Sequence, residues 1–260
     1  MRDKLKDKIV LITGGSRGIG RSIALAFARQ EARVVVTGRT LETLEAVAEE
    51  IRNLGNQALP LTCDVARREE VEALAQKIGD QLGTVQILIN NAGLAPAVSF
   101  LEMEDHLWDE VFKVNLTGTY NCCKVFLPGM LAAKWGRIIN VASTVSKVAY
   151  PNISAYTSSK HAVLGLTRAL AIEMARSGVT VNAICPGYVD TELTRKNAKL
   201  MAEKTGKGLE EVLQLFKSSS PQKRLITPEE VADVALLLAS EATKGITGQG
   251  INVDGGAVMV

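Results

Sequence analysis

Short, almost entirely apolar runs alternate along the chain with longer stretches of helical periodicity. Such runs lack the polar alternation of a half-exposed strand and are typical of parallel strands buried on both faces of a sheet. Seven runs are predicted to be strands, at residues 8–13, 32–38, 57–64, 85–91, 136–143, 179–186 and 249–256. Helices are predicted at residues 18–30, 41–54, 67–82, 104–133, 155–177 and 228–240. This alternation requires right-handed crossovers and predicts an α/β protein with a doubly wound, seven-stranded parallel sheet and helices on both faces.

One polar stretch, residues 192–222, interrupts the alternation after a predicted strand and contains a helical pattern of its own. In a doubly wound fold, an insertion after the carboxyl end of a strand lies above the ligand crevice. We interpret this stretch as a mobile substrate lid, and the alternative is a plain surface excursion. Because no linker or repeat divides the chain, residues 1–260 are predicted to form a single domain.

Composition excludes several classes of function. The 260 residues carry a formal net charge of +2, so there is no basic excess with which to neutralise a nucleic-acid backbone. The only two histidines, His106 and His161, argue against a His-rich site, and we expect no metal. The four cysteines form no C-x-x-C pair, which favours buried thiols in a reducing compartment over disulfides. They are Cys63, Cys122, Cys123 and Cys185.

The start of the sequence, MRDKLKDK, is charged and leads directly into the first predicted strand. It lacks the apolar core of a signal peptide, and no apolar run approaches the length of a membrane span. We therefore expect a cytoplasmic protein without a membrane partner.

A glycine-rich turn lies between the first predicted strand and the first predicted helix. The spacing of Gly14, Gly18 and Gly20 differs slightly from the G-x-G-x-x-G fingerprint of Rossmann-type folds. Glycines let the backbone approach a pyrophosphate, and the helix N-terminus offers free N–H groups and a positive dipole end. Because the strand–turn–helix context is present, a nucleotide site is favoured over a bare structural turn.

The end of the second predicted strand indicates which nucleotide binds. An NAD site usually has an acidic residue there, which accepts hydrogen bonds from the ribose 2′-OH. This chain has Gly38 and Arg39 instead, and Arg17 lies in the glycine turn. Two guanidinium groups without a carboxylate suit a 2′-phosphate, so NADP(H) is preferred and NAD(H) is the alternative. Both arginines could also be solvated residues at the starts of helices.

The segment SAYTSSKHAV places Tyr156 and Lys160 four positions apart, on one face of a predicted helix. Two solvated surface residues would have this spacing, and so would a phenol whose pKa is tuned by an ammonium group. His161 lies about 100° further round the helix than Lys160, so we interpret it as structural or interfacial.

Eight separated motifs together resemble the short-chain dehydrogenase/reductase family, in its order and spacing and over essentially the whole chain. They are TGGSRGIG (13–20), CDV (63–65), NNAG (90–93), VNLTG (114–118), NVAS (140–143), YTSSK (156–160), NAICPGYVDT (182–191) and ITGQGINVDGG (246–256). The resemblance implies a Rossmann-type fold and NAD(P)(H)-dependent interconversion of a ketone and a secondary alcohol. The chain looks most like 3-oxoacyl-[acyl-carrier-protein] reductases, polyketide ketoreductases and 3-hydroxyacyl dehydrogenases.

The resemblance also implies roles for the residues that match. The implied catalytic residues are Asn115, Ser143, Tyr156 and Lys160. Asn115 would kink a long helix and hold a water of the proton relay, and Asn90 would support the central strand. With Arg39 added, the expected cofactor-binding residues are Thr13, Gly14, Ser16, Arg17, Gly18, Ile19, Gly20, Arg39, Asp64, Val65, Asn91, Ala92, Gly93, Tyr156, Lys160, Pro186, Gly187, Val189 and Thr191.

The chemistry of the reaction explains these residue types. Hydride transfer to a carbonyl develops negative charge on the oxygen, which a positioned acid must protonate. A free tyrosine has a pKa near ~10, and a nearby ammonium lowers it by stabilising the phenolate. We expect Tyr156 to be this acid, Lys160 to lower its pKa and bind the nicotinamide ribose, and Ser143 to donate to the substrate oxygen.

The loops around these residues bear on the substrate. Residues 93–98 and 143–154, including Ile153, are mainly apolar, and only Lys147 could bind an anion. This composition favours a 3-oxoacyl thioester, carried by acyl carrier protein or coenzyme A, over a small free acid such as 3-hydroxybutyrate. The alternatives are another ketone or alcohol (polyketide, cyclic or aromatic) and a non-catalytic nucleotide-sensing scaffold. The intact glycine turn and catalytic residues place the scaffold last.

The resemblance further implies a homotetramer, because members of the family commonly associate through two long helices and the C-terminal strand region. The helices would be those at 104–133 and 155–177. The apolar end GGAVMV fits burial against a neighbouring subunit, although it could also close the core of one subunit.

Overall fold

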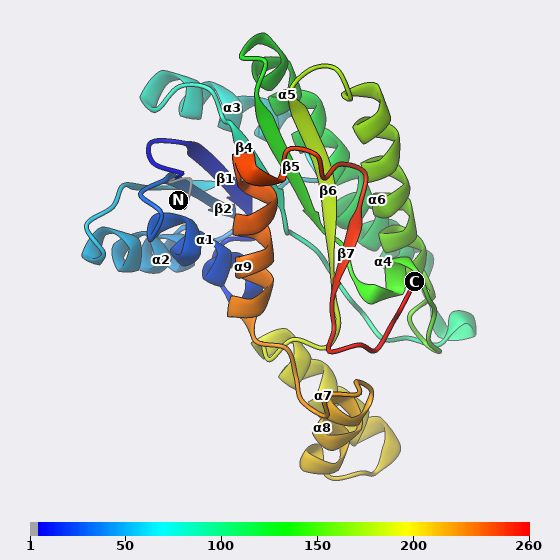
Figure 1. The fold of residues 1–260 in the computed structure, drawn as a ribbon. Coiled ribbons are helices and arrows are strands. Elements are labelled where there is room, and N and C mark those ends of the chain that lie inside the picture. Colours follow the sequence, from blue (N-terminus) through cyan, green and yellow to red (C-terminus); the bar gives the residue numbers. More distant parts are fainter. Residues whose placement is uncertain (1–4) are drawn as a thin grey trace.

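A seven-stranded parallel sheet forms the centre of the molecule in the computed structural model, which describes residues 5–260 (Figure 1). The strands are β1 (Ile9–Thr13), β2 (Arg33–Gly38), β3 (Ala58–Thr62), β4 (Ile87–Asn90), β5 (Gly136–Val141), β6 (Val179–Pro186) and β7 (Gly250–Val253). Their spatial order is β3-β2-β1-β4-β5-β6-β7, and every pair is parallel. The predicted doubly wound sheet is confirmed, and its topological switch point lies between β1 and β4.

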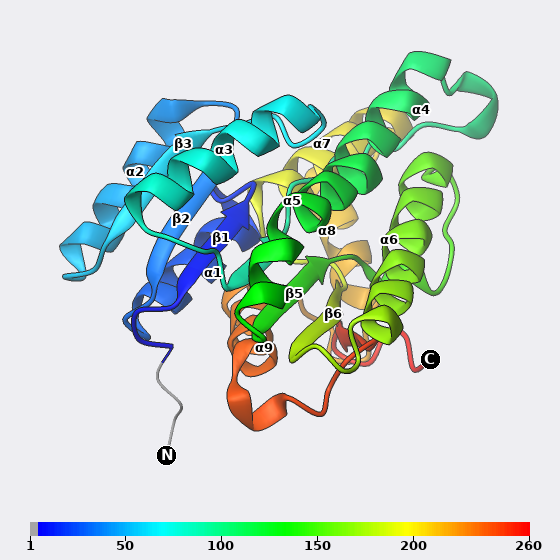
Figure 2. The same cartoon turned by 90° about the horizontal axis from the view of Figure 1, so that it is seen from above.

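Helices cover both faces of the sheet (Figure 2). They are α1 (Gly18–Ala28), α2 (Leu41–Asn53), α3 (Arg68–Gln81), α4 (Asp105–Phe112), α5 (Gly118–Ala132), α6 (Ser154–Glu173), α7 (Glu192–Thr205), α8 (Leu209–Ser218) and α9 (Pro228–Ala239). Three short 3-10 turns are η1 (Phe100–Glu102), η3 (Thr144–Ser146) and η4 (Glu241–Thr243).

Alternate strand residues serve two separate apolar layers, because successive side chains of a strand point to opposite faces. Val10 and Ile12 of β1 pack with buried residues of α1, α2 and α9. Ile9 and Leu11 of the same strand pack with buried residues of α3 and α5. Burial on both faces explains why the strand sequences are apolar throughout rather than alternating.

The predicted long helix at 104–133 is interrupted. A π-helical turn, η2 (Lys113–Thr117), separates α4 from α5, and Asn115 lies buried within it. The helix is therefore irregular at Asn115, where the resemblance implied a kink. Helical periodicity alone did not reveal it, because one inserted residue barely alters the apolar pattern.

The polar stretch at 192–222 folds into the two-helix lobe, formed by α7 and α8. Figure 1 shows it beyond the carboxyl ends of the strands. The lobe has a small apolar centre of its own, made by Ala198, Val212, Leu213 and Phe216. Its helices therefore pack on each other rather than on the sheet.

All four cysteines are buried and free, as predicted. Burial raises the pKa of Cys63 and of Cys123 to about 12, so both remain thiols. Within residues 5–260, no helix combines the length and the apolar character needed to cross a bilayer. The first four residues, with which the charged start begins, lie outside the described part of the chain.

Candidate active site

The glycine turn joins β1 to α1 at the switch point of the sheet. Gly14 and Gly18 adopt left-handed backbone conformations, with φ of 62° and 52°. A Cβ at Gly20 would lie 2.2 Å from the carbonyl oxygen of Gly14, so only glycine fits there. Ser16 is partly buried, and Ile19 packs against the core. The turn thus brings bare backbone to the N-terminus of a helix, which is the geometry that binds a pyrophosphate.

The end of β4 is fastened to this turn. The hydroxyl of Thr13 accepts hydrogen bonds from the backbone N–H groups of Asn91 and Ala92, at 2.9 and 3.0 Å. The side-chain amide of Asn91 donates to the carbonyl oxygens of Thr13 and Gly14, both at 3.0 Å. Asn90 instead points into the core, where it donates to Asn140 at 2.9 Å. Asn91 therefore supports the glycine turn, whereas Asn90 supports the sheet.

Two arginines lie exposed beside the turn. Arg17 precedes α1 and Arg39 follows β2. Neither guanidinium forms an ion pair within the part of the chain that the structure describes. Both guanidinium groups are therefore available to an anion that binds beside the glycine turn.

The loop after β3 carries Asp64 and Val65, which are expected to bind the cofactor. The backbone N–H of Asp64 donates to Glu70 at 2.8 Å, and the carboxylate of Asp64 accepts from the N–H of Ala66. The buried amide of Asn121 in α5 donates to the carbonyl oxygen of Val65 at 2.9 Å. Asp64 and Val65 are thus held in a fixed turn.

Helix α6 and the end of β5 bring together three of the four predicted catalytic residues. The Lys160 ammonium donates to the carbonyl oxygen of Val141 at 2.7 Å and lies 5.8 Å from the centre of the Tyr156 ring. The Ser143 side chain lies close enough to the Tyr156 phenol to lower its pKa. A Cβ at Gly93 would meet both the Asn115 side-chain oxygen, at 3.2 Å, and the Lys160 nitrogen, at 3.6 Å. Gly93 thus lies between the fourth residue, Asn115, and the group on α6.

Burial dominates the electrostatics of this group. It raises the pKa of Tyr156, and the hydrogen bond with Ser143 lowers that pKa by less. In the protein chain itself the pKa of Tyr156 therefore lies above its ordinary value, and the tuning of that pKa by Lys160 stays a prediction. Burial also lowers the pKa of Lys160 from 10.5 to about 8, because the ammonium loses its hydration.

The segment after β6 contacts both β7 and the glycine turn. Gly187 donates from its N–H to the carbonyl oxygen of Val253 at 3.0 Å, directly after Pro186. Val189 pairs with Ile226 in an isolated bridge. Thr191 caps α7, and its methyl group would lie 3.3 Å from a Cβ at Gly18. The predicted nicotinamide segment therefore returns to the glycine turn.

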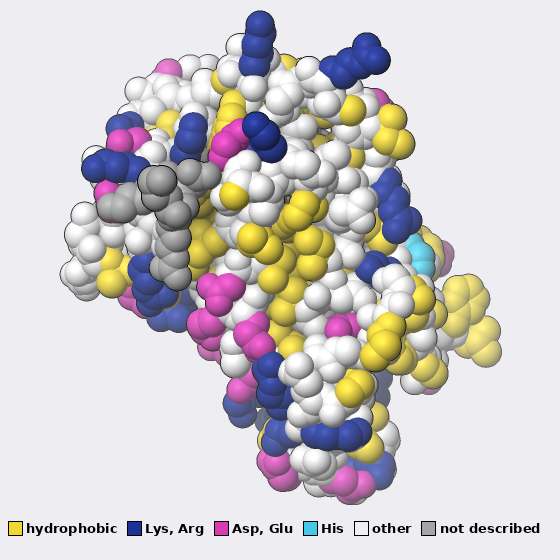
Figure 3. All heavy atoms as spheres, in the orientation of Figure 1, with side chains coloured by type: hydrophobic (Ala, Val, Ile, Leu, Met, Phe, Trp, Pro, Cys, Tyr) yellow, Lys and Arg dark blue, Asp and Glu magenta, His cyan; other side chains and the backbone are white. Residues whose placement is uncertain are grey.

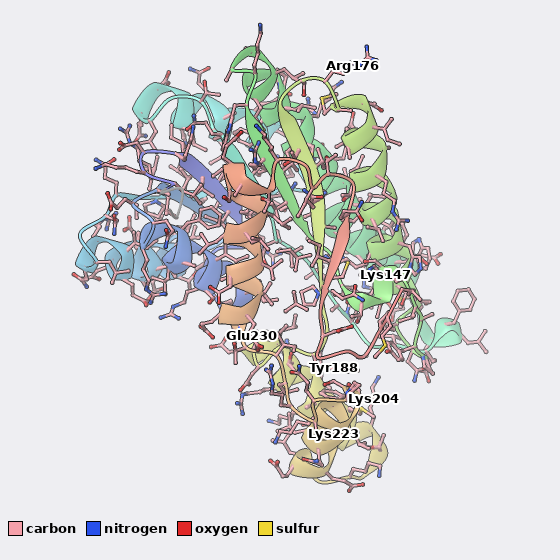
Figure 4. The ribbon with its side chains drawn as sticks, in the orientation of Figure 1. Lys147, Arg176, Tyr188, Lys204, Lys223 and Glu230 are labelled. Atoms are coloured by element: carbon pink, nitrogen blue, oxygen red, sulfur yellow. The ribbon has the colours of Figure 1, made fainter. Side chains whose placement is uncertain are left out.

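Sequence analysis also assigned roles to Lys147 and His161. Lys147 is not available as a substrate anion ligand, because its ammonium donates to the backbone oxygens of Gly250 and Val260, both at 2.7 Å (Figure 4). His161 is exposed, and its ring nitrogen lies 3.0 Å from the carbonyl oxygen of Thr157, so its structural or interfacial role stays a prediction.

One site residue was missed from the sequence. Tyr188 stands where β6 leads into the two-helix lobe (Figure 4). Its ring stacks on Phe216 of α8, with 4.2 Å between ring centres and 6° between planes. The sequence could have identified Tyr188, because it directly follows Pro186 and Gly187, which are both expected to bind the cofactor.

A doubly wound sheet with a glycine turn at its switch point defines a dinucleotide-fold protein. The family model described as short chain dehydrogenase matches residues 8–201. The 3-oxoacyl-[acyl-carrier-protein] reductase of Aquifex aeolicus is 38% identical over 257 residues, which cover 98% of this chain and 99% of that protein. D-beta-hydroxybutyrate dehydrogenase of Cupriavidus necator is 37% identical over 258 residues, which cover 98% and 99%.

The fold comparison agrees. A crystal structure of a variant of actinorhodin polyketide ketoreductase with NADPH matches with a TM-score of 0.94 at 36% identity, covering 99% of each chain. The chain belongs to the short-chain dehydrogenase family, as its motifs predicted. It is an oxidoreductase of that family.

Proposed function

We propose that the protein interconverts a ketone and a secondary alcohol with NADP(H), and that a 3-oxoacyl thioester is the ketone. The convergence of Tyr156, Ser143 and Lys160 beside the glycine turn carries this proposal. The turn fits the cofactor, because a Cβ at Gly20 would fill the cradle that bare backbone leaves open. The bound cofactor supplies or accepts the hydride.

Side chains of the protein bind the substrate oxygen, transfer the proton and stabilise the resulting phenolate. Ser143 donates a hydrogen bond to the carbonyl oxygen, and Tyr156 transfers its proton to that oxygen as negative charge develops. Because burial raises the pKa of Tyr156, the phenol stays protonated at neutral pH and is ready to act as the acid. The Lys160 ammonium stabilises the phenolate that is left and binds the nicotinamide ribose. Asn115 supports this group from the π-helical turn.

The substrate assignment rests on the walls of the site. The loop after β4 is joined to the turn before α6, because the N–H of Val98 donates to the carbonyl oxygen of Asn152 at 2.7 Å. Tyr150 and Tyr188 are partly exposed beside these loops, and Lys147 is occupied by backbone oxygens. Apolar and aromatic side chains in these loops suit an uncharged acyl chain better than a small carboxylate. Relatives that are named for 3-oxoacyl and ketoacyl reduction support this choice.

A substrate panel tests the proposed function. Initial rates with NADPH and NADH would be measured against acetoacetyl-CoA, a longer 3-oxoacyl thioester and a ketone that is not a thioester, and 3-hydroxybutyrate would be tested in the oxidative direction. We expect the longer thioester with NADPH to have the highest kcat/KM. A preference for 3-hydroxybutyrate would instead assign a hydroxybutyrate dehydrogenase, and no turnover of any carbonyl would favour a non-catalytic nucleotide-binding scaffold.

We also propose that the two-helix lobe is the substrate lid. The amide of Asn197 donates to the carbonyl oxygen of Ala95, and the ammonium of Lys204 donates to that of Ala97, both at 3.4 Å. These long bonds and the stack of Tyr188 on Phe216 join the lobe to the site walls. Long bonds of this kind suit a segment that opens and closes.

A homotetramer in the cytoplasm completes the proposal. Apolar side chains remain exposed on two helices and at the C-terminal segment, with Ile172 of α6 exposed by 79%, Leu237 of α9 by 51% and Met259 by 84%. Figure 3 shows hydrophobic side chains gathered in a band over α9 and β7. Exposed apolar surface of this extent suits burial against further copies of the chain.

The cofactor preference can be tested by reversing one charge. Arg39→Asp should raise the KM for NADPH at least about tenfold and lower that for NADH, because the carboxylate repels a 2′-phosphate and accepts from a 2′-OH. The control is Arg176→Asp, the same change at the opposite end of the sheet (Figure 4). If Arg39→Asp had the same KM values for NADPH and NADH as Arg176→Asp, the NADP(H) assignment would be overturned.

The pH dependence should report Lys160. Its ammonium is charged below its pKa of about 8 and neutral above it, whereas Tyr156, with a raised pKa, still carries its proton there. The kcat/KM for NADPH, which reflects the free enzyme, should therefore fall as the pH rises through about 8. In Lys160→Arg this fall should disappear or move upward, because guanidinium stays charged. A wild-type fall centred on the ordinary lysine value would contradict the assignment.

A further inference from the structure

Ser159 lies in the first turns of α6, between Tyr156 and Lys160, and is completely buried. Its hydroxyl makes two hydrogen bonds. It donates to the carbonyl oxygen of Tyr156 at 2.8 Å and accepts from the side-chain amide of Asn115 at 2.9 Å. The hydroxyl therefore links the helix that carries the candidate acid to the π-helical turn that carries Asn115.

The other bonds of Asn115 show what this link connects. Its side-chain oxygen accepts from the N–H of Leu94 at 2.8 Å, and its amide nitrogen donates to the carbonyl oxygen of Leu94 at 2.9 Å. Both N–H groups and the oxygen of the amide are thus used. The Asn115 side chain is committed to holding the loop after β4 against α6, and Ser159 is its contact on α6.

A purely space-filling role does not explain a hydroxyl at this position. Buried polar groups are stable only when they are paired, and an alanine would fill most of the same volume without any such demand. The adjacent Ser158 is exposed on the same helix, so helix propensity does not explain Ser159 either. What the Ser159 hydroxyl adds is a fixed register between η2 and the turn of α6 that bears Tyr156 and Lys160.

We propose that Ser159 is a positioning residue, which holds Tyr156 and Lys160 in register with Asn115 and the loop after β4. This inference rests on the proposed function, because it assigns the residue to the ketone-reducing site. Ser159 acts through its neighbours and touches neither the substrate nor the cofactor.

Ser159→Ala tests the proposal, with Ser158→Ala as the matched control. Ser159→Ala should lower kcat about tenfold, since a small displacement of the acid is costly, while the KM for NADPH stays within about twofold. Ser158→Ala should match the wild type in both constants. A kcat for Ser159→Ala equal to that of the control would overturn the proposal.

A double-mutant cycle asks whether Ser159 acts through Asn115. Asn115→Ala removes the partner, so adding Ser159→Ala should then lower kcat by less than about twofold. A further tenfold loss in the double variant would show that the two residues act independently and would contradict the proposed link.

Hydrogen exchange provides a readout that does not depend on turnover. Amides of residues 113–117 and 154–160 should exchange at least about threefold faster in Ser159→Ala than in Ser158→Ala, because the tie between the two segments is lost. Unchanged exchange would overturn the link. Failure of the proposed reaction would appear separately, as wild-type protein that reduces no ketone.

Discussion

Tyr156→Phe is expected to lower kcat for ketone reduction by about a thousandfold or more, because general acid catalysis contributes about 10²–10⁴ in rate. The substitution removes one oxygen atom and leaves the ring in place on α6. The cofactor cradle that we propose lies on α1 and the end of β4, so NADPH should bind with a Kd within about threefold of the wild-type value. Steady-state rates and fluorescence titration of NADPH measure the two effects separately.

Tyr120→Phe is the matched control for this experiment. Tyr120 lies on α5 with 47% of its surface exposed, and its hydroxyl has no place in the proposed reaction. The Tyr120→Phe variant should have the kcat and KM of the wild type. If Tyr156→Phe retained a substantial fraction of the wild-type kcat, another group would have to be the acid and the proposed mechanism would fail.

Gly20→Ala should nearly abolish cofactor binding. The new Cβ would lie 2.2 Å from the carbonyl oxygen of Gly14 and 2.6 Å from the amide nitrogen of Asn91. These contacts involve the backbone of the turn and the residue that fastens β4 to it, so neither can yield without moving the cradle. We expect the Kd for NADPH to rise by about a hundredfold or more, since binding depends on a close approach of backbone to the pyrophosphate.

Gly79→Ala provides the same substitution at a position without constraint. A Cβ on Gly79, an exposed residue within α3, meets no atom within 4 Å. This variant should bind NADPH like the wild type and unfold at an equal or slightly higher temperature, because alanine favours a helix over glycine. Wild-type NADPH affinity in Gly20→Ala would contradict the placement of the cofactor at this turn.

The sheet could be predicted from the sequence because its strands are buried on both faces. The pattern placed β6 at residues 179–186, as observed, and placed the other strands to within three residues at each end. The glycine turn was predictable for a similar reason, since the shortest contact of a Cβ at Gly20 would be with Gly14 in the same turn. Local sequence carries both kinds of information.

Other features depend on contacts between distant segments and could not be predicted. The occupation of Lys147 by backbone oxygens arises from β7 and the C-terminal segment, more than a hundred residues away. The direction of the Tyr156 pKa shift depends on how deeply α6 is buried, which spacing within the helix does not reveal. The role we propose for Ser159 likewise needed the position of Asn115 on another helix.

The transfer of label from NADPH deuterated at the nicotinamide C4 tests the central claim most directly. Reduction of a 3-oxoacyl thioester by this protein should place a single deuterium on the carbinol carbon of the product alcohol, with one of the two C4 stereoisotopomers and not with the other, and mass spectrometry of the product detects it. Tyr156→Phe should form almost no labelled alcohol. NADPH consumption without deuterium in the alcohol, or labelled alcohol formed equally well by Tyr156→Phe, would contradict the account.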